Sequence, residues 1–167
     1  LSPVGMSAMT KLAPERIEAA VELLAGAETI YLIGLRRSFP ITAYMAYVMG
    51  KLGIRNVLVD GLAGLGAEQI SFVSERDAVL AISFTPYASE TVALTQGAQA
   101  KSARIVSITD SAFSPIAPLA DLWLEIVEAN FEGFRSMAAT MALAMSLAVA
   151  VAQRRGEENR SEERRVG

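Results

Sequence analysis

The chain alternates between short apolar runs and longer segments whose apolar residues recur with helical spacing. In the first helical segment, residues 14–25, the apolar side chains Ile17, Val21 and Leu24 are three or four positions apart. This spacing places them on one face of a helix. The next run, residues 29–34, is almost wholly apolar and too short for a helix, so it predicts a buried parallel strand.

The same two patterns continue to the end of the chain and predict ten elements. Apolar runs predict strands at residues 29–34, 56–60, 78–83, 104–109 and 122–127, and helical patterns predict helices at 14–25, 41–52, 67–73, 89–100 and 134–155. Ser89 is a favourable N-cap for the fourth helix. Strands that alternate with helices indicate a parallel sheet covered on both faces. We therefore predict a doubly wound α/β domain, with a three-layer α/β/α architecture.

The ends of the chain differ from its body. We expect one domain over residues 14–155, an N-terminal extension at residues 1–13 and a polar tail at residues 156–167. The tail is rich in arginine and glutamate, which favours disorder, with a solvated extension of the last helix as the alternative. Residues 137–152 carry no charge but are shorter than the ~20 residues that a bilayer core needs. We read this alanine-rich segment as a buried helix or one packed against a second subunit, and we expect no membrane partner.

The amino-acid composition excludes several kinds of catalytic and binding chemistry. The 167 residues include no cysteine and no histidine, which removes disulfides, thiolate chemistry and the commonest acid/base at neutral pH. The net charge is −3, so the chain offers a poor surface for nucleic acid. The first ten residues lack the basic region of a signal peptide, and we expect a cytoplasmic protein. Because neither a dinucleotide-binding motif, a Walker A motif nor metal-ligand spacing occurs, we expect no cofactor and no metal.

Polar residues follow the first and third predicted strands, where ligands bind in open parallel sheets. Hydroxyl groups there, backbone N–H groups near residues 37–39 and 89–90, and two helix N-termini together favour an anion, typically a phosphate. The candidate ligand-binding residues are Gly34, Arg36, Arg37, Ser38, Ser83, Thr85, Ser89 and Glu90.

Each candidate also has a structural interpretation. Ser38 and Ser89 are acceptable helix caps, and Glu90 in a first helical turn is explained by the helix dipole. Arg36 and Arg37 are adjacent and point in different directions, so at most one is expected to reach a ligand. Asp110, after the fourth strand, is a candidate cap for the next turn.

Two of these segments resemble a known family, the sugar isomerase (SIS) domain. The sequence GLRRS at residues 34–38 resembles its Gly-x-Gly-x-Ser turn, with Arg36 in place of the second glycine. The sequence SFTPYASET at residues 83–91 resembles its Ser-x-Ser-Gly-x-Thr signature and the Glu-Thr pair that follows. Pro86 and Ala88 replace the glycine and the threonine. With residues 109–121, the pattern is most similar to the effector-binding domain of RpiR-type bacterial transcription regulators.

The resemblance implies a flavodoxin-like five-stranded parallel sheet that binds a phosphorylated sugar at the ends of strands one and three. Arg36 lacks the backbone freedom of glycine, so Arg36 or Arg37 is expected to compensate with a charge-assisted contact. A sugar acid is an alternative ligand. Residues 137–152 carry no charge and residues 41–49 are apolar nearly all round, so we predict a homodimer or tetramer through the final helix and the helix after strand one. SIS domains are generally dimeric, and the resemblance therefore implies the same. In such regulators DNA is bound by a helix-turn-helix domain, for which the thirteen residues before Pro14 leave no room.

Two functions remain open. The first is a ligand sensor without catalytic residues, which we favour. The second is a ketose–aldose phosphate isomerase, which needs a base and an acid/base for ring opening. The resemblance implies glutamate and histidine in those roles, and the chain has no histidine. Glu90, Glu128 and Glu132 are the candidate bases, so the isomerase is disfavoured but not excluded.

Overall fold

A computed structural model describes residues 12–167 and shows a five-stranded parallel sheet in the order β2-β1-β3-β4-β5. The strands are β1 (Ile30–Gly34), β2 (Asn56–Val59), β3 (Ala78–Ile82), β4 (Arg104–Thr109) and β5 (Leu122–Glu125). The chain order reverses between β1 and β3, which is the topological switch point of this flavodoxin-like arrangement. The predicted fold class is confirmed, and each predicted strand is present within one or two residues of its predicted bounds.

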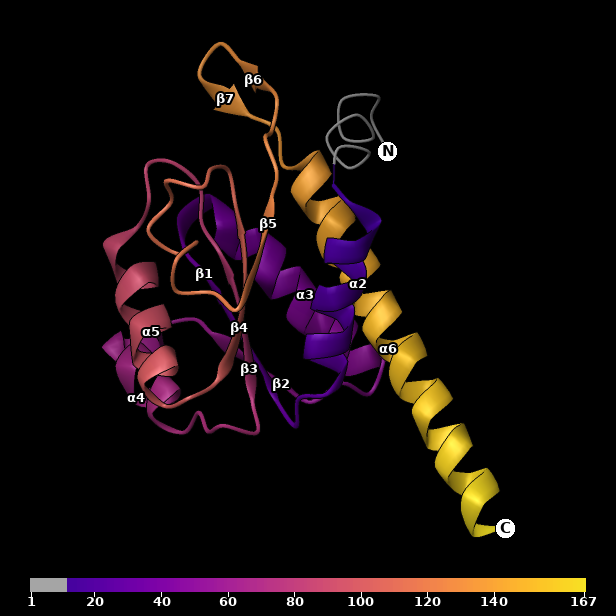
Figure 1. The fold of residues 1–167 in the computed structure, drawn as a ribbon. Coiled ribbons are helices and arrows are strands. Elements are labelled where there is room, and N and C mark those ends of the chain that lie inside the picture. The colour runs from indigo at the N-terminus through magenta and orange to yellow at the C-terminus, as the bar shows by residue number, and fades with distance from the viewer. Residues whose placement is uncertain (1–11) are drawn as a thin grey trace.

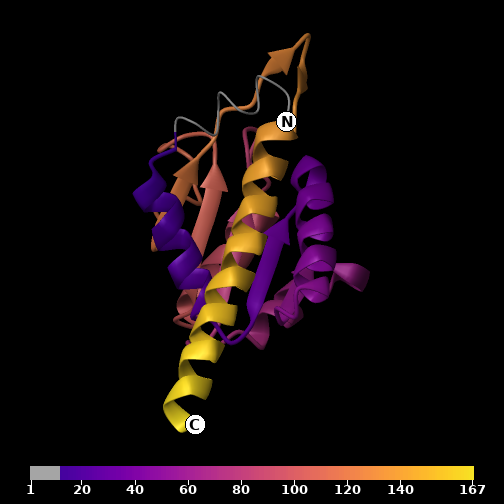
Figure 2. The same ribbon diagram turned by 90° about the vertical axis from the view of Figure 1, so that its right-hand side faces the viewer.

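Helices cover both faces of the sheet and make the three layers visible in Figure 1. One face carries α2 (Pro14–Ala25), α3 (Phe39–Lys51) and α6 (Ala138–Val166), and the other carries α4 (Gly66–Ser71) and α5 (Ser89–Ala100). In Figure 2, α6 runs along the first face between α2 and α3. Two short 3₁₀ turns, η1 (Arg36–Ser38) and η2 (Leu62–Gly64), follow β1 and β2.

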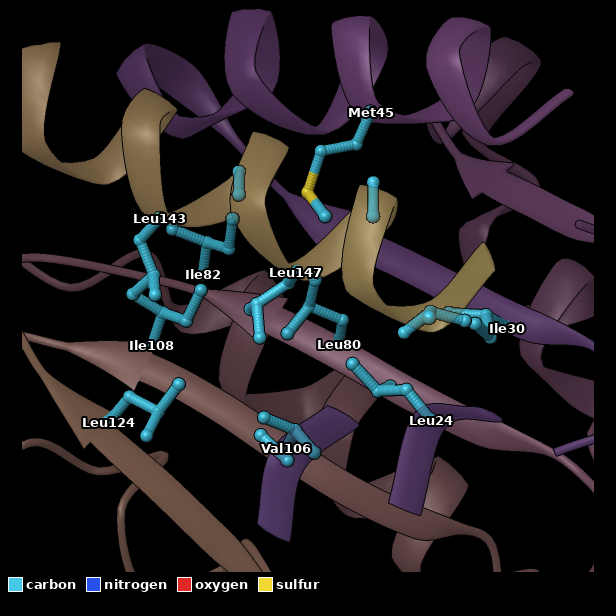
Figure 3. Close-up of a cluster of buried hydrophobic side chains, with 14 of the residues drawn as sticks. Leu24, Ile30, Met45, Leu80, Ile82, Val106, Ile108, Leu124, Leu143 and Leu147 are labelled. Carbon is cyan, nitrogen blue, oxygen red and sulfur yellow. The ribbon is translucent and has the colours of Figure 1, made fainter. Parts of the chain in front are cut away.

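The strand residues alternate between two hydrophobic cores, as the two-residue period of a strand requires. Ile30 and Leu32 of β1 face the core under α2, α3 and α6, whereas Tyr31 and Ile33 face the core under α4 and α5. Figure 3 shows the first core, where Leu143 and Leu147 of α6 lie over the strands. The uncharged half of α6 is therefore a core helix on its inner side. Among the described residues, no helix is long and apolar enough to cross a membrane.

Three local predictions need correction or refinement. The final helix begins at Ala138 rather than at Phe134, because Asn130–Phe131 (β6) and Phe134–Arg135 (β7) form an antiparallel hairpin. Ser89 is the first residue of α5, not its cap; the N-cap is Ala88, without a side-chain cap bond. The polar tail, for which we favoured disorder over a solvated helix extension, continues α6 as an exposed helix to Val166. Residues 1–11 of the expected N-terminal extension lie outside the described residues.

Candidate functional site

A small hollow of about 200 Å³ lies at the carboxyl ends of β1 and β3, beside the switch point. It is lined by the residues after β1, from Leu35 to Ser38, and by residues after β3, Ser83, Phe84, Pro86 and Ala88. The structure therefore brings four predicted residues together: Arg36, Arg37, Ser38 and Ser83. The two serines are almost fully buried, whereas both arginines are exposed.

The turn after β1 keeps a glycine-like backbone despite its arginine. Arg36, at the position of the family's second glycine, has φ +56°, in the left-handed region that costs a non-glycine residue roughly 1–2 kcal/mol. Gly34 is required for a different reason, close approach. A Cβ at Gly34 would lie 2.8 Å from Thr42 Cγ2 and 3.0 Å from the Ser38 carbonyl oxygen. Gly34 thus shapes the turn without lining the hollow.

The backbone donors of this turn are partly used within it, which departs from our expectation. The Ser38 N–H donates to the Leu35 carbonyl at 3.1 Å, and the Phe39 N–H donates to the Arg36 carbonyl. Ser38 makes no side-chain cap bond to α3, so its hydroxyl is not used as a helix cap. The donors that remain for a ligand on this side are therefore mostly side chains, the Ser38 hydroxyl and the two guanidinium groups.

The other predicted residues lie nearby but outside the small hollow. Ser89 and Glu90 form the exposed first turn of α5, which begins beside the buried Ala88. The first N–H groups of a helix have no partner within it, so α5 can still contribute backbone donors. Thr85 lines a second, larger hollow instead.

The large hollow has a volume of about 510 Å³ and adjoins the small one, since Arg37 and Phe84 line both. Its walls come from the ends of β3, β4 and β5, the β6–β7 hairpin and the first turns of α3 and α6. The polar residues that matter most are Thr85, Tyr87, Asp110, Ser111, Glu128, Asn130, Arg135 and Thr140.

Asp110 is the centre of a hydrogen-bond network in the large hollow. Its carboxylate accepts from the Tyr87 hydroxyl at 2.5 Å and from the Thr85 N–H at 3.0 Å. Arg135 of β7 pairs with it at 3.4 Å. On the other side of the loop, the Arg37 guanidinium donates to the Thr85 carbonyl. The network thus joins the loops after β1, β3 and β4 to the hairpin, and Asp110 does not act as the turn cap that we considered.

The surroundings of Asp110 favour its ionised form. Burial alone would raise the pKa of Asp110, but the hydrogen bonds from Tyr87 and Thr85 and the charge of Arg135 outweigh it, and the pKa lies below its usual value. Burial and the bond to Asp110 raise the pKa of the Tyr87 hydroxyl. At neutral pH the network is therefore a carboxylate held by a phenol, an amide and a guanidinium.

The Glu128 carboxylate accepts hydrogen bonds from the start of α6. One carboxylate oxygen accepts from the Ala139 N–H at 3.0 Å, and the other from the Thr140 hydroxyl at 3.2 Å and its N–H at 3.4 Å. A carboxylate at a helix N-terminus is stabilised by the free N–H groups and the helix dipole. Glu128 thus occupies the N-terminus of α6 where that helix borders the large hollow.

The two hollows offer different chemistry. The small one presents two cations and two hydroxyls without a carboxylate, which suits an anionic group such as phosphate. In the large hollow Asp110 is paired with Arg135, and the remaining polar side chains are available to the hydroxyl groups of a sugar. Within residues 12–167, no group of three or more acidic side chains could hold a metal ion.

Sequence reasoning missed the network residues Tyr87 and Arg135. Tyr87 lies between two positions that were compared with the SIS signature and was given no role of its own. Arg135 was placed inside the predicted last helix. The aromatic residues around Glu132-Gly133 were the available signal, because a glycine-containing two-residue turn between such residues indicates a hairpin.

Comparison with known proteins gives the context of these hollows. The family model for the SIS domain matches residues 23–150. Among curated proteins, none matches the chain.

Solved structures with a similar fold include both regulators and a proposed isomerase. The sugar isomerase domain of an RpiR transcription factor from Sphaerobacter thermophilus is 24% identical, with TM-score 0.82 over 98% of this chain and 91% of that one. The Vibrio vulnificus NanR protein, complexed with ManNAc-6P, is 20% identical, with TM-score 0.76 over 96% and 60%. A hypothetical protein of Methanococcus jannaschii, for which a 3-hexulose-6-phosphate isomerase function was inferred, is 14% identical, with TM-score 0.67 over 87% and 78%. At these identities the likeness shows the fold.

Proposed function

The chain belongs to the SIS domain family, and on that premise we propose that it is the effector-binding domain of an RpiR-type transcription regulator. Its ligand is a phosphorylated sugar or a sugar acid. DNA binding is assigned to a helix-turn-helix domain outside these 167 residues. The likeness to an RpiR domain and to a NanR protein complexed with ManNAc-6P supports this proposal.

The observation that carries the proposal is the junction of the two hollows at Arg37 and Phe84. A ligand with an anionic group in the small hollow extends directly into the large one. Both arginines line the small hollow, where we had expected at most one to reach a ligand. Ser38, Ser83, Arg36 and Arg37 therefore supply the contacts to the anion, and each hydrogen bond to a charged group is worth about 1.5–3 kcal/mol. The first turn of α5, with Ser89 and Glu90, lies beside this anion and contributes its free N–H groups.

The position of Glu128 favours a sensor over the isomerase alternative. An isomerase base must reach a proton on the sugar, but both Glu128 oxygens are bonded to the start of α6. Glu90 lies on the exposed first turn of α5, and Glu132 lies in the exposed hairpin turn, so neither lines the described hollows. The two hollows therefore offer side chains that can bind a sugar phosphate, whereas none of the three candidate glutamates is placed to act as the base.

Thermal-shift screening tests ligand binding, because a ligand that binds only the folded state raises the melting temperature. We expect several sugar phosphates or sugar acids to raise it, and at one ligand concentration the tighter ligand should raise it further. An isomerase assay with fructose 6-phosphate and arabinose 5-phosphate separates the alternatives. Turnover of either sugar that is lost in the Glu128→Gln variant would favour the enzyme, and no shift with any sugar phosphate or acid would contradict both.

We also propose that the domain assembles as a homodimer or tetramer through α3 and α6. Residues 39–50 and 138–153 carry no charge, and Tyr44, Tyr47 and Val149 are exposed on these helices. The rings of Tyr44 and Tyr47 are stacked with centroids 6.0 Å apart, which makes one apolar patch on α3. Light scattering at tens of micromolar tests this. Tyr47→Glu should shift the mass towards the monomer, and Phe72→Glu, on an exposed site after α4, should not.

A further inference from the structure

We infer that the β6–β7 hairpin is a flap over the large hollow, held closed by the ion pair between Arg135 and Asp110 and released to admit the ligand. This inference rests on the proposed function for what enters the hollow, and it adds how that site opens and closes. The hairpin is attached to the domain by a single ion pair, and its two faces differ in chemistry.

The segment that contains the hairpin forms one wall of the large hollow. Six of its residues line the hollow: Val127, Glu128, Asn130, Arg135, Ser136 and Met137. In Figure 1 the hairpin projects beyond the carboxyl ends of the strands, where the hollow lies. A change in the position of the hairpin therefore opens or closes the hollow on this side.

The two faces of the hairpin are polar and aromatic. Asn130 is opposite Arg135 and Phe131 is opposite Phe134, so the members of each pair lie on the same face. The polar pair lines the large hollow. Phe131 and Phe134 lie on the other face and are 75% and 80% exposed, so the described chain supplies no apolar packing there. A two-stranded hairpin without such packing is marginally stable in water, which makes this one easy to displace.

One ion pair attaches the hairpin strands to the rest of the domain. Among residues 12–167, the pair of Arg135 with Asp110, at 3.4 Å, is the only hydrogen bond or ion pair that joins β6 or β7 to residues outside the hairpin. This pair therefore acts as the latch of the flap.

The residues beside the hairpin provide the hinge. Residues 126–129 before it and residues 136–137 after it form neither helix nor strand. The Ser136 N–H donates to the Ala129 carbonyl at 2.9 Å and closes the base of the hairpin. Glu128, one residue before this base, is fixed to the start of α6 by its hydrogen bonds. The hairpin thus turns as one unit next to a fixed point.

Release of Arg135 costs little because Asp110 keeps its other partners. Its carboxylate still accepts from the Tyr87 hydroxyl at 2.5 Å and from the Thr85 N–H at 3.0 Å. The Arg135 side chain is 27% exposed, so water can replace the carboxylate at the guanidinium. An open state that leaves no buried charge unpaired is accessible at equilibrium. In the closed state, the Asn130 amide and the remaining N–H groups of Arg135 are available to a ligand.

Cysteine labelling tests the flap without a ligand, because the chain has no cysteine of its own. Ile41→Cys places one thiol on the wall of the large hollow, where Ile41 is 1% exposed. A small neutral reagent, methyl methanethiosulfonate, reaches this thiol when the hollow opens. If opening and closing are fast relative to labelling, the labelling rate follows the open population.

The latch is then removed with little change of shape. Arg135→Met keeps a long side chain and removes its charge. In the Ile41→Cys protein it should accelerate labelling about fivefold, as loss of one partly exposed ion pair implies. High salt should accelerate labelling when Arg135 is present and leave the rate unchanged in Arg135→Met, since salt screens the pair.

Two further cysteine variants separate opening of the flap from unfolding. Met45→Cys is the matched control, since Met45 lies one turn further along α3, is 0% exposed and lines neither hollow. Its labelling rate should not respond to Arg135→Met. Ser111→Cys, a nearly isosteric replacement on another wall of the large hollow, is a second reporter and should accelerate as Ile41→Cys does. It decides the test if Ile41→Cys does not fold.

The outcomes separate the flap from the proposed function. Labelling of the hollow reporters that Arg135→Met leaves unchanged overturns the inference and makes the hairpin a fixed wall. An acceleration that Met45→Cys shares also overturns it, because the variant then loosens the whole domain. Both results leave the sugar-phosphate sensor standing, since thermal-shift screening tests it separately. A sensor that fails that screen leaves the labelling result unchanged.

Discussion

The small hollow and the large hollow lie side by side but are built in different ways. The small hollow is made by two loops, residues 35–38 after β1 and residues 83–88 after β3, on strands that are neighbours in the sheet. The large hollow needs the ends of three strands, a hairpin and the starts of two helices. The small hollow therefore depends on two local loops after adjacent strands, whereas the large hollow depends on the topology of the whole domain.

The difference extends to charge. In the small hollow Arg36 and Arg37 face no carboxylate, so an incoming anion meets an uncompensated positive charge. In the large hollow Asp110 is paired with Arg135, and Glu128 is bonded to the start of α6. Binding strength is therefore expected to come from the small hollow, and the choice among sugars from the large one.

The largest expected effect is the loss of the two buried hydroxyls of the small hollow. Ser38→Ala combined with Ser83→Ala should weaken binding of the tightest sugar phosphate by a hundredfold or more, since each bond to a charged group is worth about 1.5–3 kcal/mol. Titration calorimetry measures it. Ser111→Ala in the large hollow is the control and should cost less than about tenfold. Equal losses in both would erase the distinction between the hollows.

The next effect concerns Arg37, which belongs to both hollows. Arg37→Gln should reduce sugar-phosphate affinity by about tenfold, the value of one charged hydrogen bond of ~1.5 kcal/mol. The reduction should shrink at high salt, because the lost contact is electrostatic. Arg104→Gln, at the opposite end of the sheet, is the matched control. Wild-type affinity in the Arg37 variant would show that the Arg37 side chain is exposed to solvent and does not contact the ligand.

Asp110 tests the internal pairing of the large hollow through stability. Asp110→Asn should lower the free energy of unfolding at pH 7 by about 1–2 kcal/mol, or roughly 2–8 °C in melting temperature. Because folding lowers the pKa of Asp110, its stabilisation is full above the usual aspartate pKa of about 4 and is lost as the pH falls through the lowered value. Melting curves from pH 7 to pH 2 should therefore converge for the two proteins. A difference in melting temperature that stays constant from pH 7 to pH 2 would contradict an ionised Asp110 in the folded protein.

The smallest effect concerns the backbone of the turn after β1. With φ +56° at Arg36, glycine should be more stable than alanine there by about 1 kcal/mol. Denaturant unfolding of Arg36→Gly and Arg36→Ala measures the difference. Both should bind sugar phosphate more weakly than wild type if the Arg36 side chain contacts the anion. Alanine as stable as glycine would mean that the turn relaxes out of the left-handed conformation.

The sequence predicted those parts of the molecule that depend on neighbouring residues. Each strand could be recognised from its own apolar run, whereas the flavodoxin-like sheet, in which the chain order reverses between β1 and β3, was what the resemblance to the SIS domain implied. The two serines of the small hollow were predictable from their place in the chain, since Ser38 lies in the short turn after β1 and Ser83 comes directly after β3. Whether they bind a ligand stays a prediction.

The large hollow could not be predicted, because its contacts join residues far apart in the chain. Asp110 meets Tyr87 and Arg135, 23 and 25 positions away, so in sequence it looked like a local turn cap. The hairpin was hidden because Glu132, with φ +48°, occupies a turn position that usually favours asparagine, aspartate or glycine. The extension of α6 to Val166 was obscured by its charges, although arginine and glutamate are good helix formers.

A crystal structure of the domain with the sugar phosphate that binds most tightly tests the central claim most directly. The account predicts the phosphate in the small hollow, within hydrogen-bond distance of the Ser38 and Ser83 hydroxyls, with the sugar ring in the large hollow between Phe84 and the hairpin. A phosphate bound to Arg135 in the large hollow, with the small hollow unused, would contradict it.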